Sequence, residues 1–395
     1  MSARRTPARR GGHALVLPPL DRGLLGVTLG LLAFGLVMVG SASLATADHA
    51  FGDPFHYLFR DLLALALALP AGALAYGVPP QRWQRHGTLL LFLGIGGLVL
   101  VLVPGLGHGA NGATRWIRLG PLNLQASEFM KLFAVIYVSD YLVRRKEEVT
   151  HYLSGFLNPL LLVSLACALI MAQPDFGTTA VILATVLGLL FLGGAPLWQF
   201  AALLGLTLGA LAALVLTADY RLRRITAFVD PWEHVYGAGY QLTQALIAFG
   251  RGHWTGVGLG NGIQKQFYLP EAHTDFIMAV IGEEFGLPGS AAVILAFAFI
   301  TWKAFAIARR ARARDQEFSA YLAQGIGLWL GLQGFVNMGV NMGLLPTKGL
   351  TLPFLSYGSN SLIMACMAMG ILLRIDHEQR VAGPGSGGER GPWAR

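Results

Sequence analysis

The chain has 395 residues, of which 54% are hydrophobic and only 13% charged, and its net charge is +8. So few charges over this length exclude a soluble enzyme and are typical of a polytopic membrane protein. The basic residues cluster between long apolar runs, so the net charge indicates membrane orientation and not a nucleic-acid partner. Cys167 and Cys366 both lie inside apolar runs, which excludes a disulfide framework and a cysteine metal cluster.

Apolar runs of roughly 17 to 25 residues predict the membrane-spanning helices. In chain order they are residues 24–41, 57–78, 88–106, 127–143, 156–172, 178–194, 198–217, 275–305, 321–345 and 361–373. Basic segments follow alternate spans, so both chain ends are predicted to be cytoplasmic. The sequence therefore predicts an all-α polytopic membrane protein of about ten transmembrane helices.

The predicted domain organisation has three parts. Residues 1–22 are expected to be a disordered, basic cytoplasmic arm, because they carry several arginines and no apolar periodicity. Residues 23–376 are expected to form the transmembrane domain, with a long outer loop over residues 218–274 between the seventh and eighth spans. Residues 377–395 are rich in glycine and are expected to be a disordered cytoplasmic tail.

Segment 268–276 places two carboxylates and the imidazole of His273 directly before the eighth span. Pro270 disfavours helix at the residue before it, so the helix is expected to start close to Thr274 or Asp275. Asp275 would then lie at the membrane surface, at the mouth of a helix. This position suits a catalytic carboxylate or a simple N-cap, and the residues alone leave both open.

Other ionisable residues are predicted to face the same outer compartment. Glu128 and Lys131 lie at the start of the fourth span, three positions apart, so they share a helix face and could form a pair. Ionisable groups near a membrane usually face a protein or water-filled interior, so a functional role is equally open. Arg115 precedes this span, and Lys348 lies in the loop between the ninth and tenth spans.

The eighth span contains two adjacent carboxylates, Glu283 and Glu284. On a helix they point about 100° apart and cannot both face one cavity, so one of them is expected to be structural and to pair with a buried base. Glu283 lies about 12 Å along the helix axis from Asp275, too far to act with it as a carboxylate pair. The glycine run 256–262 lacks the spacing of a phosphate-binding loop and predicts a close-packed or re-entrant loop.

A series of motifs in order along the chain resembles the SEDS family of membrane proteins. The motifs are Arg115-Trp-Ile, Gln125-Ala-Ser-Glu128 with Lys131, Gln173-Pro-Asp-Phe-Gly177, Gly239-Tyr-Gln-Leu-Thr-Gln244, Leu269-Pro-Glu-Ala-His-Thr-Asp-Phe276 and Pro346-Thr-Lys-Gly-Leu-Thr-Leu-Pro-Phe-Leu-Ser-Tyr-Gly358. The resemblance extends to Asp376, and Thr347-Lys348-Gly349 is closer to the family's cell-division branch than to its elongation branch. Ala126 and Ser359-Asn360 depart from the family's usual proline and Gly-Ser, without removing an ionisable group.

The resemblance implies a peptidoglycan glycosyltransferase that polymerises lipid II at the periplasmic face of the inner membrane during septal cell-wall synthesis. It implies that Asp275 is the general base of an inverting transfer. The residues implied to bind the substrate are Arg115, Glu128, Lys131, His273 and Lys348. Desolvation would raise the pKa of the Asp275 carboxyl, and nearby cations would oppose this. The sequence has no compact metal-ligand spacing, which leaves a divalent cation, Mg²⁺ or Mn²⁺, open and its site unknown.

The implied partners lie in the inner membrane at the division septum. They are a class B penicillin-binding protein (FtsI), other divisome membrane proteins and membrane lipids, with no nucleic acid. Two other functions stay open beside the polymerase. A lipid II flippase would need a path to the cytoplasmic face and would make Glu283 or Glu284 critical, whereas a non-catalytic divisome scaffold would not need the Asp275 carboxylate.

Overall fold

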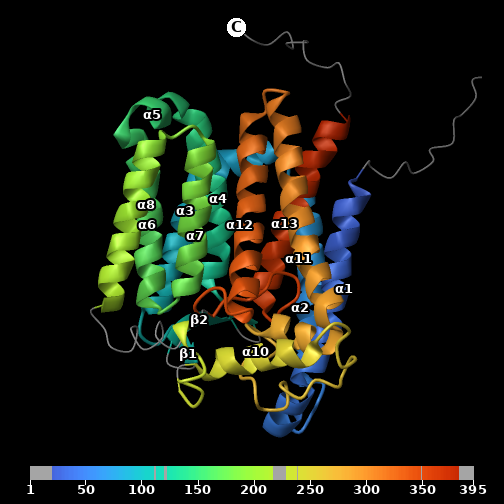
Figure 1. Ribbon diagram of the computed structural model, residues 1–395. Helices are drawn as coiled ribbons and strands as arrows, with labels where there is room; N and C mark the ends of the chain where they lie inside the picture. The colour runs from blue at the N-terminus through green and yellow to red at the C-terminus, as the bar shows by residue number, and fades with distance from the viewer. Residues whose placement is uncertain are drawn as a thin grey trace, which may run out of the picture.

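The computed structural model describes residues 20–110, 113–119, 122–216, 228–237, 239–347 and 349–381. Figure 1 shows long helices that run side by side between the two ends of the molecule. Six of the described helices are long and apolar enough to cross a membrane, and two shorter apolar helices accompany them. The protein is therefore a helical, multi-pass membrane protein, as the composition predicts.

Ten long helices form the bundle in the described part of the chain. They are α1 (Arg22–Phe51), α2 (His56–Gly77), α3 (Pro80–Leu102), α4 (Ala126–Arg144), α6 (Leu153–Ala172), α7 (Phe176–Leu192), α8 (Leu197–Leu216), α11 (Ile277–Arg312), α12 (Glu317–Asn341) and α13 (Ser359–Val381). Each predicted span corresponds to one of them. Several helices run past the predicted spans, and α13 continues beyond the predicted boundary at Asp376, because hydropathy marks only the part of a helix that lies in the membrane.

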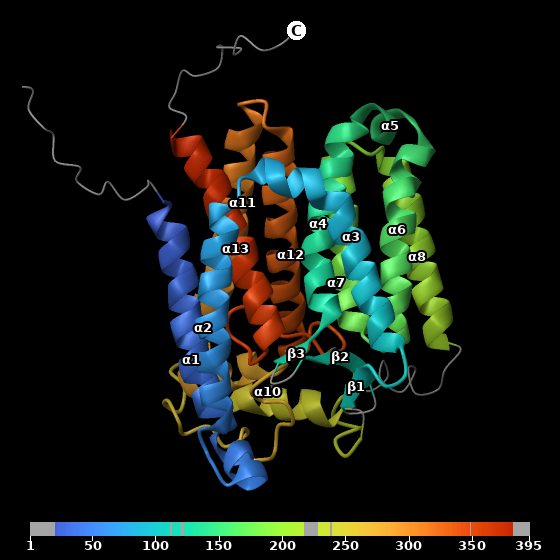
Figure 2. The same ribbon diagram turned by 180° about the vertical axis from the view of Figure 1, so that it is seen from behind.

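The shorter elements lie at the two ends of the bundle. Helix α5 (Lys146–His151) lies at the cytoplasmic end, while helix α10 (Tyr240–Gly252) lies across the outer end. The strands β1 (Gly107–Ala110), β2 (Ala113–Leu119) and β3 (Leu122–Leu124) form an antiparallel sheet in the order β1-β2-β3. Figure 2 shows this sheet at the same end as α10. The outer loops therefore contain regular structure that the sequence reading did not predict.

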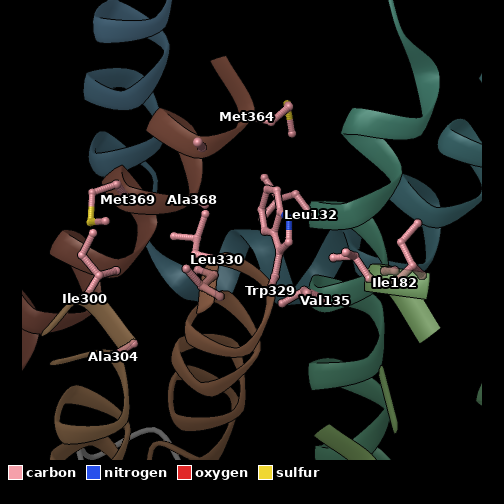
Figure 3. Packing of buried hydrophobic residues seen from close by; sticks show 14 of the residues in the cluster. Leu132, Val135, Ile182, Ile300, Ala304, Trp329, Leu330, Met364, Ala368 and Met369 are labelled. Carbon is pink, nitrogen blue, oxygen red and sulfur yellow. The ribbon is translucent and has the colours of Figure 1, made fainter. Parts of the chain in front are cut away.

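The middle of the bundle is filled by a continuous core of buried apolar side chains. Figure 3 shows part of this core around Trp329 of α12, which is 2% exposed. Leu132 of α4 and Ile182 of α7 lie on one side of it, and Ile300 of α11 and Ala368 of α13 on the other. Helix α12 is thus central in the bundle, and apolar side chains of α4, α7, α11 and α13 pack around it.

Helices α2 and α13 pack backbone to backbone through glycine. A Cβ atom added at Gly370 would lie 2.1 Å from the Gly72 carbonyl oxygen, and one added at Gly72 would lie 2.8 Å from the Cys366 carbonyl oxygen. Small residues allow such close approach between membrane helices. Because α2 also lines the candidate site, this contact fixes the position of one wall of that site.

Helix α11 is broken at Gly286, where φ is 61°. The main-chain carbonyls of Glu283 and Glu284 accept hydrogen bonds from Val257 N and Gly258 N, both at 3.0 Å. The break in α11 and the predicted close-packed glycine loop are therefore parts of one structure. The loop satisfies carbonyl groups that the break would otherwise leave without a partner, as a membrane environment requires.

The side chains of Glu283 and Glu284 fasten the outer loop to α11. Arg251 Nη1 donates to Glu283 Oε1 at 2.9 Å, and two main-chain N–H groups of the loop donate to the same carboxylate. Lys265 Nζ donates to Glu284 Oε1 at 2.5 Å, and Ser41 Oγ at 2.9 Å. The prediction that one of the two pairs with a buried base is confirmed for Glu284, and Glu283 has a partly exposed base of its own.

Asp21 joins three helices at the cytoplasmic end. It is the N-cap of α1, where Leu24 N donates to its Oδ1 at 2.9 Å. Its Oδ2 accepts from Lys303 of α11 at 2.8 Å and from Arg380 of α13 at 2.7 Å. The first and last described helices therefore begin and end at the same side of the membrane, in agreement with the predicted orientation.

We expect Gly370→Ala to lower the unfolding temperature in detergent, because its new Cβ would overlap the Gly72 carbonyl. Overpacking of this kind costs about 1–3 kcal/mol. Gly26→Ala is the matched control, since nothing lies within 4 Å of a Cβ placed there and a helical alanine gains about 1 kcal/mol over glycine. Equal unfolding temperatures for the two variants would contradict the backbone contact.

Candidate active site

A cavity of about 650 Å³ opens at the outer end of the bundle. The charged residues that line it are Arg60, Arg115, Glu128, Asp175, Glu271 and Asp275. The apolar residues that line it include Leu63, Ala64 and Leu67 of α2, Phe129 of α4 and Ile363 of α13. The cavity therefore combines a polar region, with charges of both signs, and an apolar wall.

The apolar wall lies on one face of α2. Leu63 and Leu67 are four residues apart, so they project from the same side of the helix, and Arg60 lies one turn before them. Leu63 is 66% exposed and Leu67 is 47% exposed. These exposed leucine side chains give the cavity an apolar surface along α2.

Asp275 lies in the turn before α11 and lines the cavity. The N-cap of α11 is Phe276, which makes no side-chain cap hydrogen bond, and Thr274 Oγ1 donates to Glu271 Oε2 at 2.7 Å. The alternative in which Thr274 or Asp275 simply caps the helix is therefore wrong, because the helix begins only at Ile277. In the described part of the chain, no group donates a hydrogen bond to the Asp275 carboxylate, which is left available to a ligand.

Two buried asparagines of α12 hold the main chain of Asp275. Asn337 Nδ2 and Asn341 Nδ2 each donate to the Asp275 carbonyl oxygen at 2.9 Å, and Asn341 Oδ1 accepts from Ala279 N at 3.1 Å. Asn337 Nδ2 also donates to the Leu350 carbonyl at 2.5 Å. These contacts fix the turn before α11 and join it to the loop after α12.

Gln333, one turn earlier on the same face of α12, continues this row of buried amides. Its Nε2 donates to a main-chain carbonyl of the loop after α12 at 2.9 Å. Its Oε1 accepts from Lys131 Nζ and from Trp329 Nε1, both at 2.9 Å. The sequence reading missed the whole row. Its signal is polar residues at four-residue spacing inside an otherwise apolar span, where polar groups usually have a function.

The electrostatic surroundings of Asp275 raise its pKa. Burial raises the pKa of this carboxyl to about 7, and the negative charges of Glu271 and Asp175 act in the same direction. The positive charge of Arg115 acts against them. The raised pKa therefore lies in the range in which a general base works best at neutral pH.

Arg115 of β2 is held by main-chain carbonyl groups. Its Nε donates to the Gln173 oxygen at 3.1 Å, and its Nη2 donates to the Pro174 oxygen at 2.5 Å. Gln173 in turn donates from Nε2 to the Leu98 oxygen at 3.1 Å. Carbonyl groups fix a guanidinium without cancelling its charge, so Arg115 keeps a full positive charge in the cavity.

Glu128 and Lys131 form the pair that their spacing predicts, with 2.7 Å between Lys131 Nζ and Glu128 Oε2. Only Glu128 lines the cavity. Lys131 is 2% exposed and lies behind it, with its ammonium 5.5 Å from the centre of the Trp329 ring. Lys131 therefore contacts the cavity through Glu128 and does not line it directly.

His273 lies beside the cavity in an aromatic cluster and is 8% exposed. Its ring centre lies 4.5 Å from that of Tyr57 and 5.6 Å from that of Tyr357, and its carbonyl accepts from Tyr357 N at 2.9 Å. Burial lowers the pKa of the imidazole, and the charge of Glu271 opposes this. The structure thus places His273 as a packing residue of the turn that carries Asp275.

One predicted cation lies outside the described residues, and one cation of the cavity was not predicted. Lys348 lies outside the described residues, but Gly349 lines the cavity, and a Cβ added there would lie 3.2 Å from Asp275 Oδ2. Arg60 lines the cavity from α2 and was missed by the sequence reading. Its signal was a cation at the outer end of a predicted span. Asn360, one of the departures from the family pattern, donates to the Asn123 oxygen at 2.7 Å and joins α13 to β3.

The carboxylates of the cavity do not gather into a metal site. Within the described ranges, no three His, Cys, Asp or Glu side chains come close enough together to hold a metal ion. A divalent cation would therefore need ligands from the substrate as well as from this chain. Asp275 lines the cavity, and no described residue donates a hydrogen bond to its carboxylate, so this carboxylate fits such a shared role.

We expect Asn341→Ala to lower the free energy of unfolding by about 1–3 kcal/mol, because it removes the buried amide that donates to the Asp275 carbonyl and accepts from Ala279 N. Thermal unfolding in detergent measures this. Asn261→Ala is the matched control, since Asn261 is exposed and such surface changes stay within about 0.5 kcal/mol. If both variants unfold at the wild-type temperature, the asparagine contacts do not hold the turn.

Comparison with known proteins places this geometry in a family. The family model of the FtsW, RodA and SpoVE cell cycle proteins matches residues 22–381. A protein of Allochromatium vinosum named "Probable peptidoglycan glycosyltransferase FtsW" is 57% identical over 392 residues, which cover 99% of this chain and 97% of the relative. A protein of Methylococcus capsulatus with the same name is 51% identical over 394 residues, which cover 98% and 99%.

Solved structures give the same result. One solved chain comes from a structure described as "Structural coordination of polymerization and crosslinking by a peptidoglycan synthase complex". It matches with a TM-score of 0.75 and 26% identity, over 91% of this chain and 98% of that one. The rod shape determining protein RodA of Thermus thermophilus matches with a TM-score of 0.67 at the same identity and coverage. The identity to the two proteins named FtsW is higher than the identity to RodA, which agrees with the predicted cell-division branch of the family. The chain belongs to the SEDS family of FtsW, RodA and SpoVE cell cycle proteins.

Proposed function

We propose that this protein is a peptidoglycan glycosyltransferase that polymerises lipid II at the outer face of the inner membrane, with the cavity as its active site. The names of its relatives support the activity. The assignment of the site depends on the Asp275 carboxylate, which does not cap α11 and shares one cavity with Arg60 and Arg115. Lipid II has a sugar hydroxyl, a pyrophosphate and a polyprenyl tail, and the cavity offers a base, two cations and an apolar wall to match.

In the proposed transfer, Asp275 removes the proton from the 4-hydroxyl of the acceptor sugar. The freed oxygen forms a bond to the anomeric carbon of the donor, while the bond from that carbon to the pyrophosphate oxygen breaks. The bonding electrons leave with undecaprenyl pyrophosphate, and the anomeric configuration inverts. Arg115 and Arg60 stabilise the negative charge that develops on the leaving group.

The remaining predicted site residues take supporting roles in this proposal. Glu128 lines the cavity and accepts a hydrogen bond from a sugar hydroxyl, while Lys131 behind it forms an ion pair with the carboxylate and holds it in place. His273 holds the Asp275 turn through its aromatic contacts. Lys348 adds a third cation near the pyrophosphate, as the family resemblance implies.

The two other functions receive less support from the geometry. The flippase would make Glu283 or Glu284 critical, yet both carboxylates are used to fasten the outer loop. A non-catalytic scaffold would not need a carboxylate that lies in a cavity, caps no helix and has a raised pKa. A polymerase uses both features, so it accounts for more of the structure.

We further propose that the protein works at the division septum with a class B penicillin-binding protein, FtsI, and other divisome membrane proteins. The solved relative belongs to a peptidoglycan synthase complex, which supports a partner of this kind. Such a transpeptidase would crosslink the strand that this protein polymerises. The higher identity to FtsW proteins than to RodA supports the division role.

We expect Asp275→Asn to abolish glycan synthesis from purified lipid II, since the amide cannot accept the proton of the acceptor hydroxyl. The assay uses the detergent-solubilised complex with its transpeptidase. Asp315→Asn is the matched control, because it makes the same change at an exposed residue in the turn between α11 and α12, at the cytoplasmic end. Wild-type glycan from Asp275→Asn, in a complex that assembles normally, would exclude Asp275 as the base.

We expect the rate to fall in acid with a midpoint close to pH 7, the value to which burial raises the pKa of Asp275. Below that pH the carboxyl is protonated and cannot act as a base, so kcat/KM falls about tenfold per pH unit. Glu271→Gln removes a charge that raises this pKa, so the midpoint should move to lower pH. A midpoint near the ordinary aspartate value of about 4 would contradict the raised pKa of Asp275.

A further inference from the structure

Asp175 is a carboxylate of the cavity that the proposed transfer does not use. It lines the cavity but is only 3% exposed. Its Oδ1 accepts from Thr178 N at 3.2 Å, and its Oδ2 accepts from Thr178 Oγ1 at 2.9 Å and from Ser127 Oγ at 3.3 Å. Asp175 is therefore the N-cap of α7 and also ties that helix to the first turn of α4.

The turn that Asp175 fixes is the one that holds Arg115. The carbonyl groups of Gln173 and Pro174, directly before Asp175, accept the two hydrogen bonds of the guanidinium. Asp175 N donates to the Ile170 oxygen at 3.2 Å, so the main chain of the turn is anchored on both sides of these carbonyls. A change at Asp175 would move the two oxygens to which Arg115 is bound.

The chemistry of these contacts suits a residue that places a cation for a ligand. Three donors occupy the Asp175 carboxylate, and neutral oxygens hold Arg115, so neither group cancels the charge of the other through a direct pair. The guanidinium is thus fixed in direction and keeps its charge for an anion. Preorganised cations of this kind stabilise developing negative charge without reorganising during the reaction.

We propose that Asp175 is a positioning residue of the transfer reaction, because it fixes the turn whose carbonyl oxygens hold Arg115 in the cavity for the substrate pyrophosphate. This inference rests on the proposed function. It assigns to the Gln-Pro-Asp-Phe-Gly turn a role in holding Arg115, with Asp175 acting through Arg115 and not on the reacting atoms. The charge of Asp175 has a second effect, since it helps to raise the pKa of Asp275.

A double-mutant cycle tests this coupling. In the complex with the transpeptidase, Asp175→Ala and Arg115→Ala should each weaken lipid II binding and lower kcat/KM by about 10–100-fold, as misplaced catalytic groups do. The double variant should be no worse than Arg115→Ala by more than about twofold, because both changes remove one interaction. If the two losses multiply in full, Asp175 does not act through Arg115.

A matched cycle separates positioning from loss of a helix cap. Asp21 is also an acidic N-cap, on α1 at the cytoplasmic end and away from the cavity. Asp21→Ala should lower the unfolding temperature and leave lipid II affinity unchanged, and its effects should combine independently with those of Arg115→Ala. The proposal would be overturned if Asp21→Ala showed the same non-additivity with Arg115→Ala that Asp175→Ala shows.

Asp175→Asn decides the question even if Asp175→Ala does not fold. Asparagine is an equally good N-cap and keeps the turn, so lipid II affinity should stay within about twofold of wild type. It removes the charge, so the acidic limb of the rate profile should move to lower pH. A weakened affinity would overturn the proposal, whereas an unmoved limb would contradict the second effect of Asp175, that of its charge on the pKa of Asp275. Full activity of Asp275→Asn would instead overturn only the proposed base, because the coupling is also read from binding.

Discussion

The start of α11 depends on one constraint, which is that a main-chain polar group in or near a membrane must find a partner inside the protein. The Asp275 carbonyl, at the turn before this helix, receives hydrogen bonds from Asn337 and Asn341 of α12. The break at Gly286 is satisfied in the same way by the glycine loop. Both irregular segments are thus held by groups far away in the sequence, and the turn before α11 carries the Asp275 side chain at the cavity.

The charges of the cavity are arranged around ligands that the chain itself does not supply. Asp275 has no donor among the described residues and a raised pKa, while Arg115 is bound by carbonyls that leave its charge intact. By contrast, Glu283, Glu284 and Lys131 have partners of their own. Among the charged residues that line the cavity, Glu128 has an ion-pair partner, and the structure shows none for the others within its described residues. The ion pairs of Glu283 and Glu284 lie away from the cavity lining and hold the outer loop.

The ten helices could be predicted because hydropathy depends only on local sequence, and the cavity could be predicted in part because Arg115, Glu128 and Asp275 were all expected on the outer side. The positions of Lys131 behind Glu128 and of His273 between two tyrosines could not, because they depend on residues far away in the chain. The sequence around Asp275 could not decide whether this residue caps α11, since the same local sequence suits an N-cap and a cavity carboxylate.

The most direct test is a structure of the Asp275→Asn complex with lipid II or a lipid-linked analogue bound. The account predicts the acceptor 4-hydroxyl within hydrogen-bond distance of residue 275, the pyrophosphate against Arg115 and Arg60, and the lipid tail along Leu63 and Leu67 of α2. A substrate bound elsewhere, or one whose pyrophosphate lies away from both arginines, would contradict it.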